Sequence, residues 1–343
     1  MFKKNSLVLL SALLAACVPL PAPSEVAADE WLAVYFSDPN ADGAELMQGG
    51  PDEPLAAALT AAEQTIEIAI YDLDMTNIRN ALISAAQREV QVRLVIESEN
   101  FTPVDLQLLL DAGIAVVGDE DPDLMHNKFA IIDRREVWTG SFNYTITDAY
   151  GNRNNLVKVE SALLVENYLA EFEEMFTQGL FGSASPANTP NPQFSVNGTL
   201  VETYFSPDDG VQAHLVDLVD GARESIYFLA YSFTSDELAE ALVAAKERGV
   251  EIRGVMDDTQ AANSGGEFGR LTANDIEVRL DGEGGRLHHK VLIFDEAVVA
   301  TGSYNFSASA ENRNDENSLV IHQEQIAGEF IEDFWRIWEL AEP

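Results

Sequence analysis

The stretch His126–Asp133, with the sequence HNKFAIID, decides the fold, because the chain contains it twice. The second copy is His288–Asp295, with the sequence HHKVLIFD. The copies are followed, after the same interval, by Gly140–Asn143 (GSFN) and Gly302–Asn305 (GSYN). One such match can arise from composition alone, but two matches in register indicate an internal duplication.

Each copy predicts a short buried strand next to a histidine and a lysine. The residues after each lysine are an apolar run that charged residues terminate, which is typical of a buried strand. Because side chains alternate across a strand, His126 and Lys128 are expected on one face, as are His288 and Lys290. An imidazole beside an ammonium group suits an anionic phosphate. The lysine neutralises an oxygen, while the histidine attacks phosphorus or protonates the leaving oxygen.

The other repeated polar residues are expected to have supporting roles. Asp133 and Asp295 lie an odd number of positions after their histidines, so an unbroken strand turns them to the opposite face, and we predict structural roles for both. His289 falls on that face too, where packing or solvent is expected. Each Gly-Ser-x-Asn segment supplies a tight turn, a hydroxyl and an amide that can donate to phosphate oxygens without adding charge.

Similarity between the two parts of the chain extends well beyond the motifs. Val34–Ser37 returns as Thr203–Ser206, and Thr65–Tyr71 returns as Ser225–Tyr231. Helical spacing at 78–87 and 237–246 alternates with apolar runs that are typical of a parallel sheet covered on both faces. We therefore predict an α/β fold of two related halves, each a mostly parallel sheet flanked by helices. The first half spans residues 31–182 and the second spans 200–343, with a proline-containing linker at 183–199.

The first 30 residues read as a targeting segment and a tether. Lys3 and Lys4 precede an apolar stretch too short to cross a membrane, and Leu14-Ala15-Ala16-Cys17 resembles a bacterial lipobox. We expect a lipoprotein signal at 1–17, lipidation of Cys17, a tether at 18–30 and an extracytoplasmic, membrane-anchored location. The alternative is an ordinary signal peptide with an incidental cysteine. Cys17 is the only cysteine, so no internal disulfide can form.

The chain is strongly acidic, with a formal net charge of −38 at pH 7. Beyond Cys17 the only lysines are Lys128, Lys158, Lys246 and Lys290, and two of these belong to the motifs. Because nucleic-acid binding depends on basic side chains that contact phosphates, this composition argues against an extended nucleic-acid surface.

The two HxKxxxxD motifs with their GSxN segments resemble the signature of the phospholipase D superfamily, and the resemblance covers essentially the whole chain after the tether. It implies two halves packed about a pseudo-two-fold axis with one active site per chain. It also implies a double displacement, in which one histidine forms a phosphohistidine and the other protonates the departing alcohol. No metal or other cofactor is implied, because the lysines neutralise charge. The residues that would hold the phosphate are Lys128, Lys290, Asn143 and Asn305, with Ser141 and Ser303 in support.

A downstream carboxylate distinguishes the two halves. Many members of this superfamily carry Asn-x-Glu, whose carboxylate orients a histidine, and the second half has it as Asn314–Glu316. In the first half, Asn154 occupies the position of that carboxylate. Since a neighbouring carboxylate raises the pKa of an imidazole, we expect Glu316 to keep His288 protonated as the general acid. His126 would then be the nucleophile, as the N-terminal histidine commonly is in related enzymes.

The leading hypothesis is a phospholipase D-like phosphodiesterase that acts on phospholipid headgroups. A nuclease is an alternative, because some superfamily members cut DNA and arginines such as Arg286 and Arg313 can form a small basic pocket. A cardiolipin-synthase-type transferase is a second alternative. A binding protein without activity is disfavoured, because His, Lys and Asn are intact in both motifs.

Overall fold

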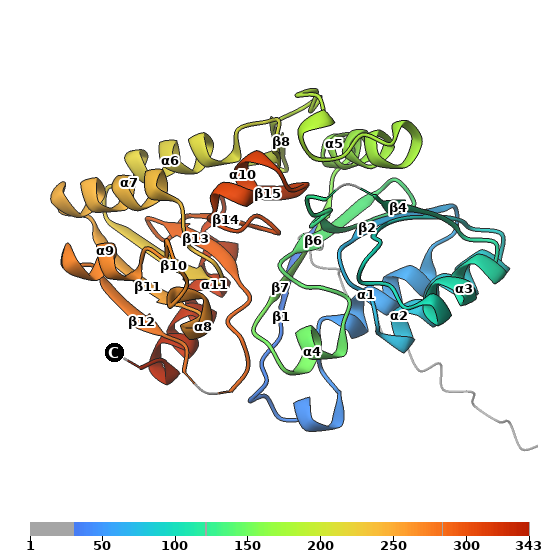
Figure 1. Cartoon of the computed structure of the whole chain (residues 1–343), viewed down its shortest axis with the longest axis horizontal. Helices are drawn as coiled ribbons and strands as arrows, with labels where there is room; N and C mark the ends of the chain where they lie inside the picture. Colours follow the sequence, from blue (N-terminus) through green and yellow to red (C-terminus); the bar gives the residue numbers. More distant parts are fainter. Residues whose placement is uncertain (1–30, 121, 283, 343) are drawn as a thin grey trace, which may run out of the picture. The chain divides into compact units, whose positions relative to one another are not determined.

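The computed structural model describes residues 31–120, 122–282 and 284–342. The expected signal, Cys17 and the tether lie outside the described residues. Residues from Trp31 onward form one unit. Two sheets with their covering helices make up this unit (Figure 1).

The first half builds a seven-stranded sheet in the order β1-β7-β6-β5-β2-β3-β4. Its strands are β1 (Leu32–Phe36), β2 (Thr65–Ile70), β3 (Gln91–Glu97), β4 (Ala115–Asp119), β5 (Lys128–Ile132), β6 (Glu136–Gly140) and β7 (Asn155–Glu160). Its helices are η1 (Ala44–Leu46), α1 (Asp52–Ala61), α2 (Thr76–Gln87), α3 (Pro103–Asp111), α4 (Ile146–Tyr150), α5 (Ala162–Glu173), η2 (Glu174–Gln178) and η3 (Gly182–Ala184).

The second half repeats this plan in an eight-stranded sheet with the order β12-β11-β10-β13-β14-β15-β9-β8. Its strands are β8 (Gln193–Val196), β9 (Thr199–Ser206), β10 (Ser225–Ala230), β11 (Glu251–Met256), β12 (Glu277–Leu280), β13 (Lys290–Phe294), β14 (Val298–Gly302) and β15 (Glu316–Ile321). Its helices are α6 (Val211–Gly221), α7 (Asp236–Glu247), α8 (Asp258–Ala261), α9 (Phe268–Ala273), α10 (Ala308–Asn312) and α11 (Glu324–Leu340).

The predicted α/β class with two related halves is confirmed, but the sheets are mixed rather than mostly parallel. Only β2-β3-β4 in the first half and β10-β11-β12 in the second pair in parallel. The motif strand β5 continues through a short turn into β6, and β6 pairs antiparallel with β7. Such short connections can join only antiparallel neighbours, whereas parallel strands need a longer crossover. The apolar runs showed that the strands are buried but not the direction in which they pair.

The segment expected to be a linker also contributes to the second sheet. Its strand β8 pairs antiparallel with β9 at the sheet edge, and Phe194 pairs with Val201. Phe194 is buried in the main core. The predicted linker at 183–199 therefore contains an edge strand in which the buried Phe194 alternates with polar neighbours.

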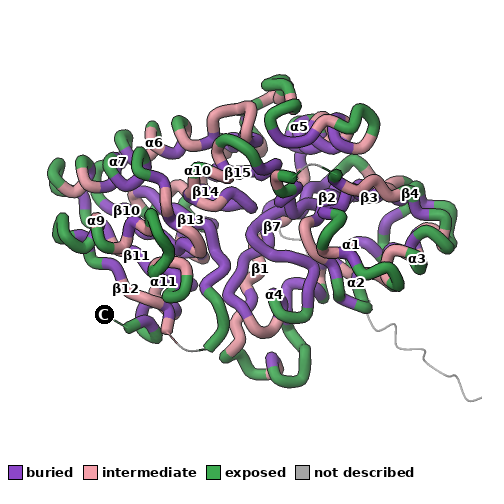
Figure 2. The backbone as a smooth tube through the Cα atoms, in the orientation of Figure 1, coloured by how far each residue is buried: buried purple, intermediate pink, exposed green. Residues whose placement is uncertain are grey.

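The main core lies between the two sheets, and both halves contribute to it. Helices α5 and α11 pack there, while α1 and α2 cover the outer face of the first sheet and α6 and α7 that of the second (Figures 1 and 2). Tyr168 on α5 is fully buried, and its ring lies 5.0 Å from Phe129 of the first half and 5.0 Å from Phe205 of the second. Because one apolar core is shared, neither half buries its inner face alone.

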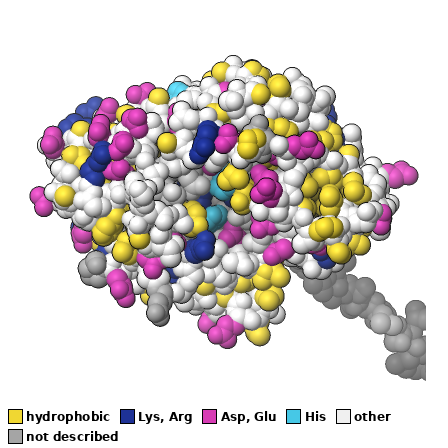
Figure 3. Space-filling model, in the orientation of Figure 1, with side chains coloured by type: hydrophobic (Ala, Val, Ile, Leu, Met, Phe, Trp, Pro, Cys, Tyr) yellow, Lys and Arg dark blue, Asp and Glu magenta, His cyan; other side chains and the backbone are white. Residues whose placement is uncertain are grey.

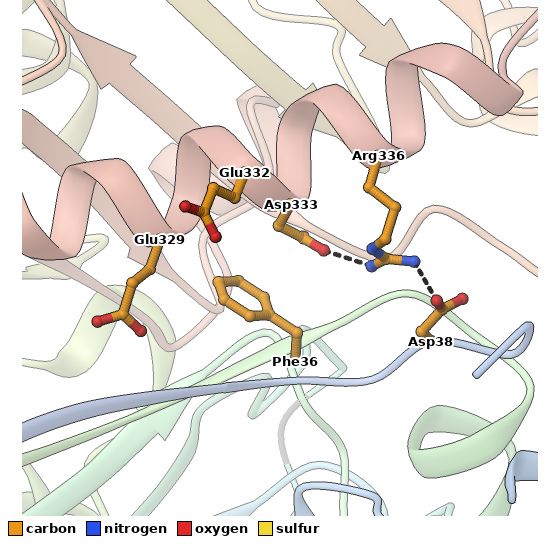
Figure 4. A pocket seen from close by; sticks show the side chains of 6 residues that line it. All are labelled: Phe36, Asp38, Glu329, Glu332, Asp333 and Arg336. Atoms are coloured by element: carbon orange, nitrogen blue, oxygen red, sulfur yellow. Dashed lines mark hydrogen bonds and ion pairs between the residues drawn. The ribbon is translucent and has the colours of Figure 1, made fainter. Parts of the chain in front are cut away.

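A partly buried polar link also joins the halves beside this core. His289, the residue between the motif His and Lys, is fully buried, which is the first of the two environments expected for it, and its Nε2 lies 3.2 Å from Asp333 on α11. Figure 4 shows that Asp333 contacts Arg336, which in turn pairs with Asp38 of the first half. The equivalent residue in the first motif, Asn127, contacts Glu171 on α5 instead. These contacts fix α5 and α11 against the motif strands.

Candidate active site

The main chain of each motif histidine is held by the opposite half of the molecule. The backbone N–H of His126 donates to the Asp315 carbonyl over 3.0 Å, and that of His288 donates to the Arg153 carbonyl over 2.9 Å. Isolated parallel bridges at Met125–Asp315 and Arg153–Leu287 flank these bonds. The two contacts are equivalent and reciprocal, so they bring both motifs to one place about a pseudo-two-fold axis.

The carboxylate of Glu316 lies against His126, which corrects the expectation that it would support His288. Its Oε2 is 2.7 Å from His126 Nδ1, and the glutamate is fully buried. The bridge between Met125 and Asp315 places the neighbouring residue Glu316 beside the histidine of the other half. Burial lowers the pKa of His126 to about 4, and Glu316 offsets only part of this effect. His126 is therefore neutral at pH 7, with Nδ1–H directed to the carboxylate and Nε2 free to react.

His288 has a different set of partners. Its Nδ1 lies 2.8 Å from Asn154 Oδ1, and the Oδ2 of Asp148 on α4 is 3.5 Å away. Burial, followed by the positive charge of Lys290, lowers the pKa of His288 well below its ordinary value. Sequence reasoning missed Asp148. It could have been found by comparing the halves position by position, because the second half has Ala310 at the equivalent position.

The two motif lysines are buried at the base of the site. The Nζ of Lys128 donates to the His126 carbonyl and that of Lys290 to the His288 carbonyl, both over 2.7 Å. Burial lowers the pKa of Lys128 to about 7 despite the carboxylates nearby. Burial together with Lys128 lowers the pKa of Lys290 to about 7 as well. Two such ammonium groups are poorly compensated until an anion binds.

Two tyrosines also line the active-site cavity, and the sequence analysis gave them no functional role. Tyr71 lies edge-on to His126, with ring centroids 4.8 Å apart, and Tyr231 lies edge-on to His288 at 4.7 Å. The Nζ of each motif lysine is also close to one of these rings, at 4.9 Å and 4.8 Å from the centroid. Tyr71 and Tyr231 are the last residues of the repeated segments Thr65–Tyr71 and Ser225–Tyr231, so a comparison of the two halves could have identified them.

The asparagines and the serines of the two GSxN segments lie in different places relative to the active-site cavity. Asn143 and Asn305 line the cavity, and their Oδ1 atoms have no partner among the described residues. Ser141 and Ser303 are fully buried and do not line it. Ser141 Oγ donates to Asn154 Oδ1 at 3.0 Å, and Ser303 Oγ accepts from the backbone of Asn317 at 2.9 Å. The expected serine contacts with phosphate are therefore replaced by contacts that hold the supporting residues.

The glycine of each GSxN segment is required by a close approach between strands. Gly140 has φ 154° and Gly302 has φ 149°. A Cβ at these positions would lie 2.3 Å from the Asn155 carbonyl oxygen and 2.2 Å from that of Asn317. The glycines thus let β6 and β14 turn directly beside β7 and β15.

The motif aspartates lie away from the cavity, at the far end of their strands. Asp133 Oδ1 accepts from the backbone N–H groups of residues 63–65, and Asp295 Oδ1 from those of 223–225. Burial by itself would raise the pKa of each carboxyl, but these N–H groups outweigh burial and hold it below the ordinary value. Each aspartate fastens the end of a motif strand to the start of the neighbouring strand.

The histidines, asparagines and tyrosines line a cavity of about 510 Å³ between the halves. In Figure 3 the histidine side chains lie in a hollow with Lys or Arg side chains on two sides. A separate hollow of about 480 Å³ lies between Phe36, Asp38 and α11 (Figure 4), and none of the motif histidines or lysines lines it.

Carboxylates that could together hold a metal ion are found once among residues 31–120, 122–282 and 284–342. Asp257, Asp258 and Asp281 form this group. Both oxygens of Asp281 accept backbone N–H groups, from Asp258 at 2.9 Å and from Leu287 at 2.7 Å. Asp281 thereby anchors the loop that leads into His288. None of the described helices is long and apolar enough to cross a membrane.

We expect sulfate to bind this site more weakly as the pH rises. A lysine with a pKa of about 7 loses its proton above that pH, and a bound dianion favours the ammonium form, so binding is coupled to proton uptake. Because sulfate itself does not titrate in this range, calorimetric affinity should fall at least about tenfold between pH 6 and pH 8. Lys128→Met should shrink this dependence. Affinity that stays constant over this range would contradict the role of the lysines.

Comparison with known proteins agrees with the duplicated site. Residues 55–176 and 215–338 each match the family described as "Cardiolipin synthase, PLD-like domain". A phospholipase D from Rickettsia bellii is 33% identical over 154 residues, which are 43% of this chain and 77% of the relative. Human mitochondrial cardiolipin hydrolase is 37% identical over 122 residues, so the match spans 36% of this chain and about half, 48%, of that protein.

Among solved structures, phosphatidylserine synthase from Haemophilus influenzae has the same fold over most of both chains. The TM-score is 0.67 at 13% identity, and the alignment covers 90% of this chain and 86% of the synthase. Fold and site together define a duplicated α/β protein with two phosphodiesterase motifs in one cavity. The chain belongs to the phospholipase D superfamily, and its relatives support phosphodiesterase activity.

Proposed function

We propose that the protein cleaves phospholipid headgroups, by hydrolysis or transfer, through a phosphohistidine and without a metal ion. The observation that carries the proposal is the convergence of both motif histidines on one cavity, with each motif lysine bonded to the backbone carbonyl of its own histidine. The names of the relatives, phospholipase D and cardiolipin hydrolase, favour a lipid phosphodiester as the substrate.

His126 is assigned as the nucleophile. The sequence suggested this role because His126 had no carboxylate partner, whereas in the structure the role is supported by the carboxylate of Glu316. Attack of its neutral Nε2 on phosphorus creates positive charge on the ring, and the buried carboxylate of Glu316, 2.7 Å from Nδ1, stabilises that charge. In an in-line displacement the alcohol leaves from the opposite side, where His288 lies. The phosphodiester raises the affinity of His288 for a proton, which it gives to the leaving oxygen before it activates water or another alcohol.

The lysines and asparagines stabilise the phosphorane-like transition state. Lys128 and Lys290 offer two buried ammonium groups next to the histidines, and the side-chain amides of Asn143 and Asn305 line the cavity. The two ammonium groups are fixed and buried before substrate binds, so their charges contribute more than they would in solvent.

Asp148 is expected to replace the carboxylate that the first half lacks. Asp148→Ala should lower kcat by about tenfold to a hundredfold, because it removes the carboxylate that lies 3.5 Å from Nδ1 of His288. Adding Asn154→Glu should restore activity to within a few-fold, because it gives His288 the partner that His126 has in Glu316. Steady-state kinetics and the acid limb of the pH profile check both results. A double variant no better than Asp148→Ala, at an unchanged Tm, would reject compensation.

Product analysis on mixed phospholipids and on single-stranded DNA, each with and without chelator, tests the proposed function. Release of headgroup or its exchange for an added alcohol supports it. Cleavage of DNA with intact lipids would favour a nuclease, and inactivity on every diester would reject an enzymatic role.

We also propose that a lipid on Cys17 anchors the protein to an extracytoplasmic membrane face. The pattern Leu-Ala-Ala-Cys supports this, and the further acylation of a diacylated cysteine supplies the chains that stable anchoring needs. Mass spectrometry of the native N-terminus should find a lipidated Cys17 as the first residue. An unmodified terminus at another residue contradicts the anchor.

A further inference from the structure

The active-site cavity extends farther over the second half than over the first. The first half contributes Tyr71, Leu124, His126, Asn143, Asp148 and Asn152 to its lining. The second half contributes the equivalents of most of these and also a set of neutral polar side chains: Ser232, Thr234, Gln260, Ser307 and Ser309. We call these five residues the hydroxyl shelf. Arg286 lines the cavity next to it.

The backbone holds two shelf residues in a fixed orientation. Between β10 and α7, Phe233 is buried and bridges to Phe306, while Thr234 N–H donates to the Phe306 carbonyl over 2.8 Å. Since side chains alternate along this extended segment, Ser232 and Thr234 both turn away from the core and into the cavity. Within the described part of the chain, neither hydroxyl has a hydrogen-bond partner, so both are free to bind a ligand.

The equivalent segment of the first half has a different character. Asp72 and Asp74 flank the buried Leu73 there, and neither lines the cavity. The shelf, in contrast, contains no carboxylate. A cationic headgroup therefore finds no counter-charge on the shelf, whereas a neutral ligand with several hydroxyls finds donors and acceptors.

The direction of the reaction identifies which part of the substrate lies there. If His126 attacks, the His126–phosphorus bond forms as the bond from phosphorus to the alcohol oxygen breaks. The electron pair goes to that oxygen, and the proton comes from His288. The departing alcohol is then on the side of His288, whose ring lies edge-on to Tyr231, the residue that precedes Ser232.

We propose that the hydroxyl shelf is an alcohol subsite that selects a neutral polyol, such as a glycerol group, next to the scissile phosphate. This inference rests on the proposed function and specifies its substrate class. The same surface serves a polyol that leaves as a headgroup and one that enters from solution as an acceptor.

Three soluble diesters test the shelf: short-chain phosphatidylglycerol, short-chain phosphatidylcholine and bis(4-nitrophenyl) phosphate. We expect kcat/KM of the wild type to favour the glycerol ester over the choline ester by at least about tenfold. The double variant Ser232→Ala/Thr234→Val should lose about tenfold on the glycerol ester and less than about twofold on the nitrophenyl ester, which has no hydroxyl to bind. Thr147→Ala, an exposed position on α4, is the control and should change neither rate.

An acceptor experiment distinguishes the two sources of polyol. With glycerol added to the nitrophenyl reaction, formation of glyceryl 4-nitrophenyl phosphate that falls about tenfold in the double variant identifies a free acceptor. A preference for the glycerol ester without that product identifies a headgroup, and either result supports the shelf. Equal or better cleavage of the choline ester, or an equal loss on all three diesters in the variant, overturns it. Wild-type inactivity on every diester would instead reject the proposed function.

Discussion

Lys128→Met and Lys290→Met are each expected to lower kcat/KM by about a thousandfold, which corresponds to about 4 kcal/mol of transition-state stabilisation. Both ammonium groups are buried beneath the histidines, where each faces a tyrosine ring and a backbone carbonyl. Methionine has a similar length and no charge, so it fits the buried slot while it removes the electrostatic contribution. Steady-state kinetics on a phospholipid and on a nitrophenyl diester provide the measurement.

Because the lysines supply the positive charge at the active site, we expect a chelator to leave the activity of the wild type unchanged. Lys246→Met is the matched control, because that lysine lies in the last turn of α7 and not next to a motif histidine, and its kinetics should be unchanged. Near-normal activity in both motif variants would reject the electrostatic role. Activity lost in chelator and restored by a divalent ion would show that a metal supplies the charge instead.

The duplication made the main architecture predictable from the sequence. Two motifs with identical spacing defined two halves, and the resemblance to a known superfamily implied that they share one site. The pairing directions were not predictable, because a buried apolar strand reads the same whether its neighbours are parallel or antiparallel. The short turn between β5 and β6 was the signal for an antiparallel pair.

The partners of the histidines were the least accessible part of the site. Glu316 is closer in sequence to His288, but the backbone bridge at Met125–Asp315 places it on His126. Ser141 was expected to face phosphate because it belongs to the motif, yet its hydroxyl holds Asn154, which contacts His288. Such contacts cross between halves or lie behind the visible motif, so linear spacing carries little information about them.

The division of labour between the histidines has an equally large expected effect. His288→Ala should lower turnover of a phospholipid by about a thousandfold or more, because an alkoxide leaving group needs a proton. The same variant should still react with a nitrophenyl diester, since nitrophenolate leaves without a general acid. The phosphohistidine should then persist, because the residue that would activate the incoming water is gone. Denaturation at alkaline pH, where the phosphorus–nitrogen bond is stable, followed by peptide mapping should find the phosphoryl group on His126.

Three further variants separate this assignment from its reverse. His126→Ala should form no covalent intermediate with either substrate, and His214→Ala should behave as the wild type, because His214 stacks on Tyr204 outside the cavity. Glu316→Gln should still form the intermediate but more slowly, since the amide cannot stabilise the charge that develops on His126. Detection of the phosphoryl group on His288 in the wild type would show that His288 is the nucleophile and His126 the general acid. The carboxylate at 2.7 Å from His126 would then hold a proton on the general acid, and Asp148 would support the nucleophile.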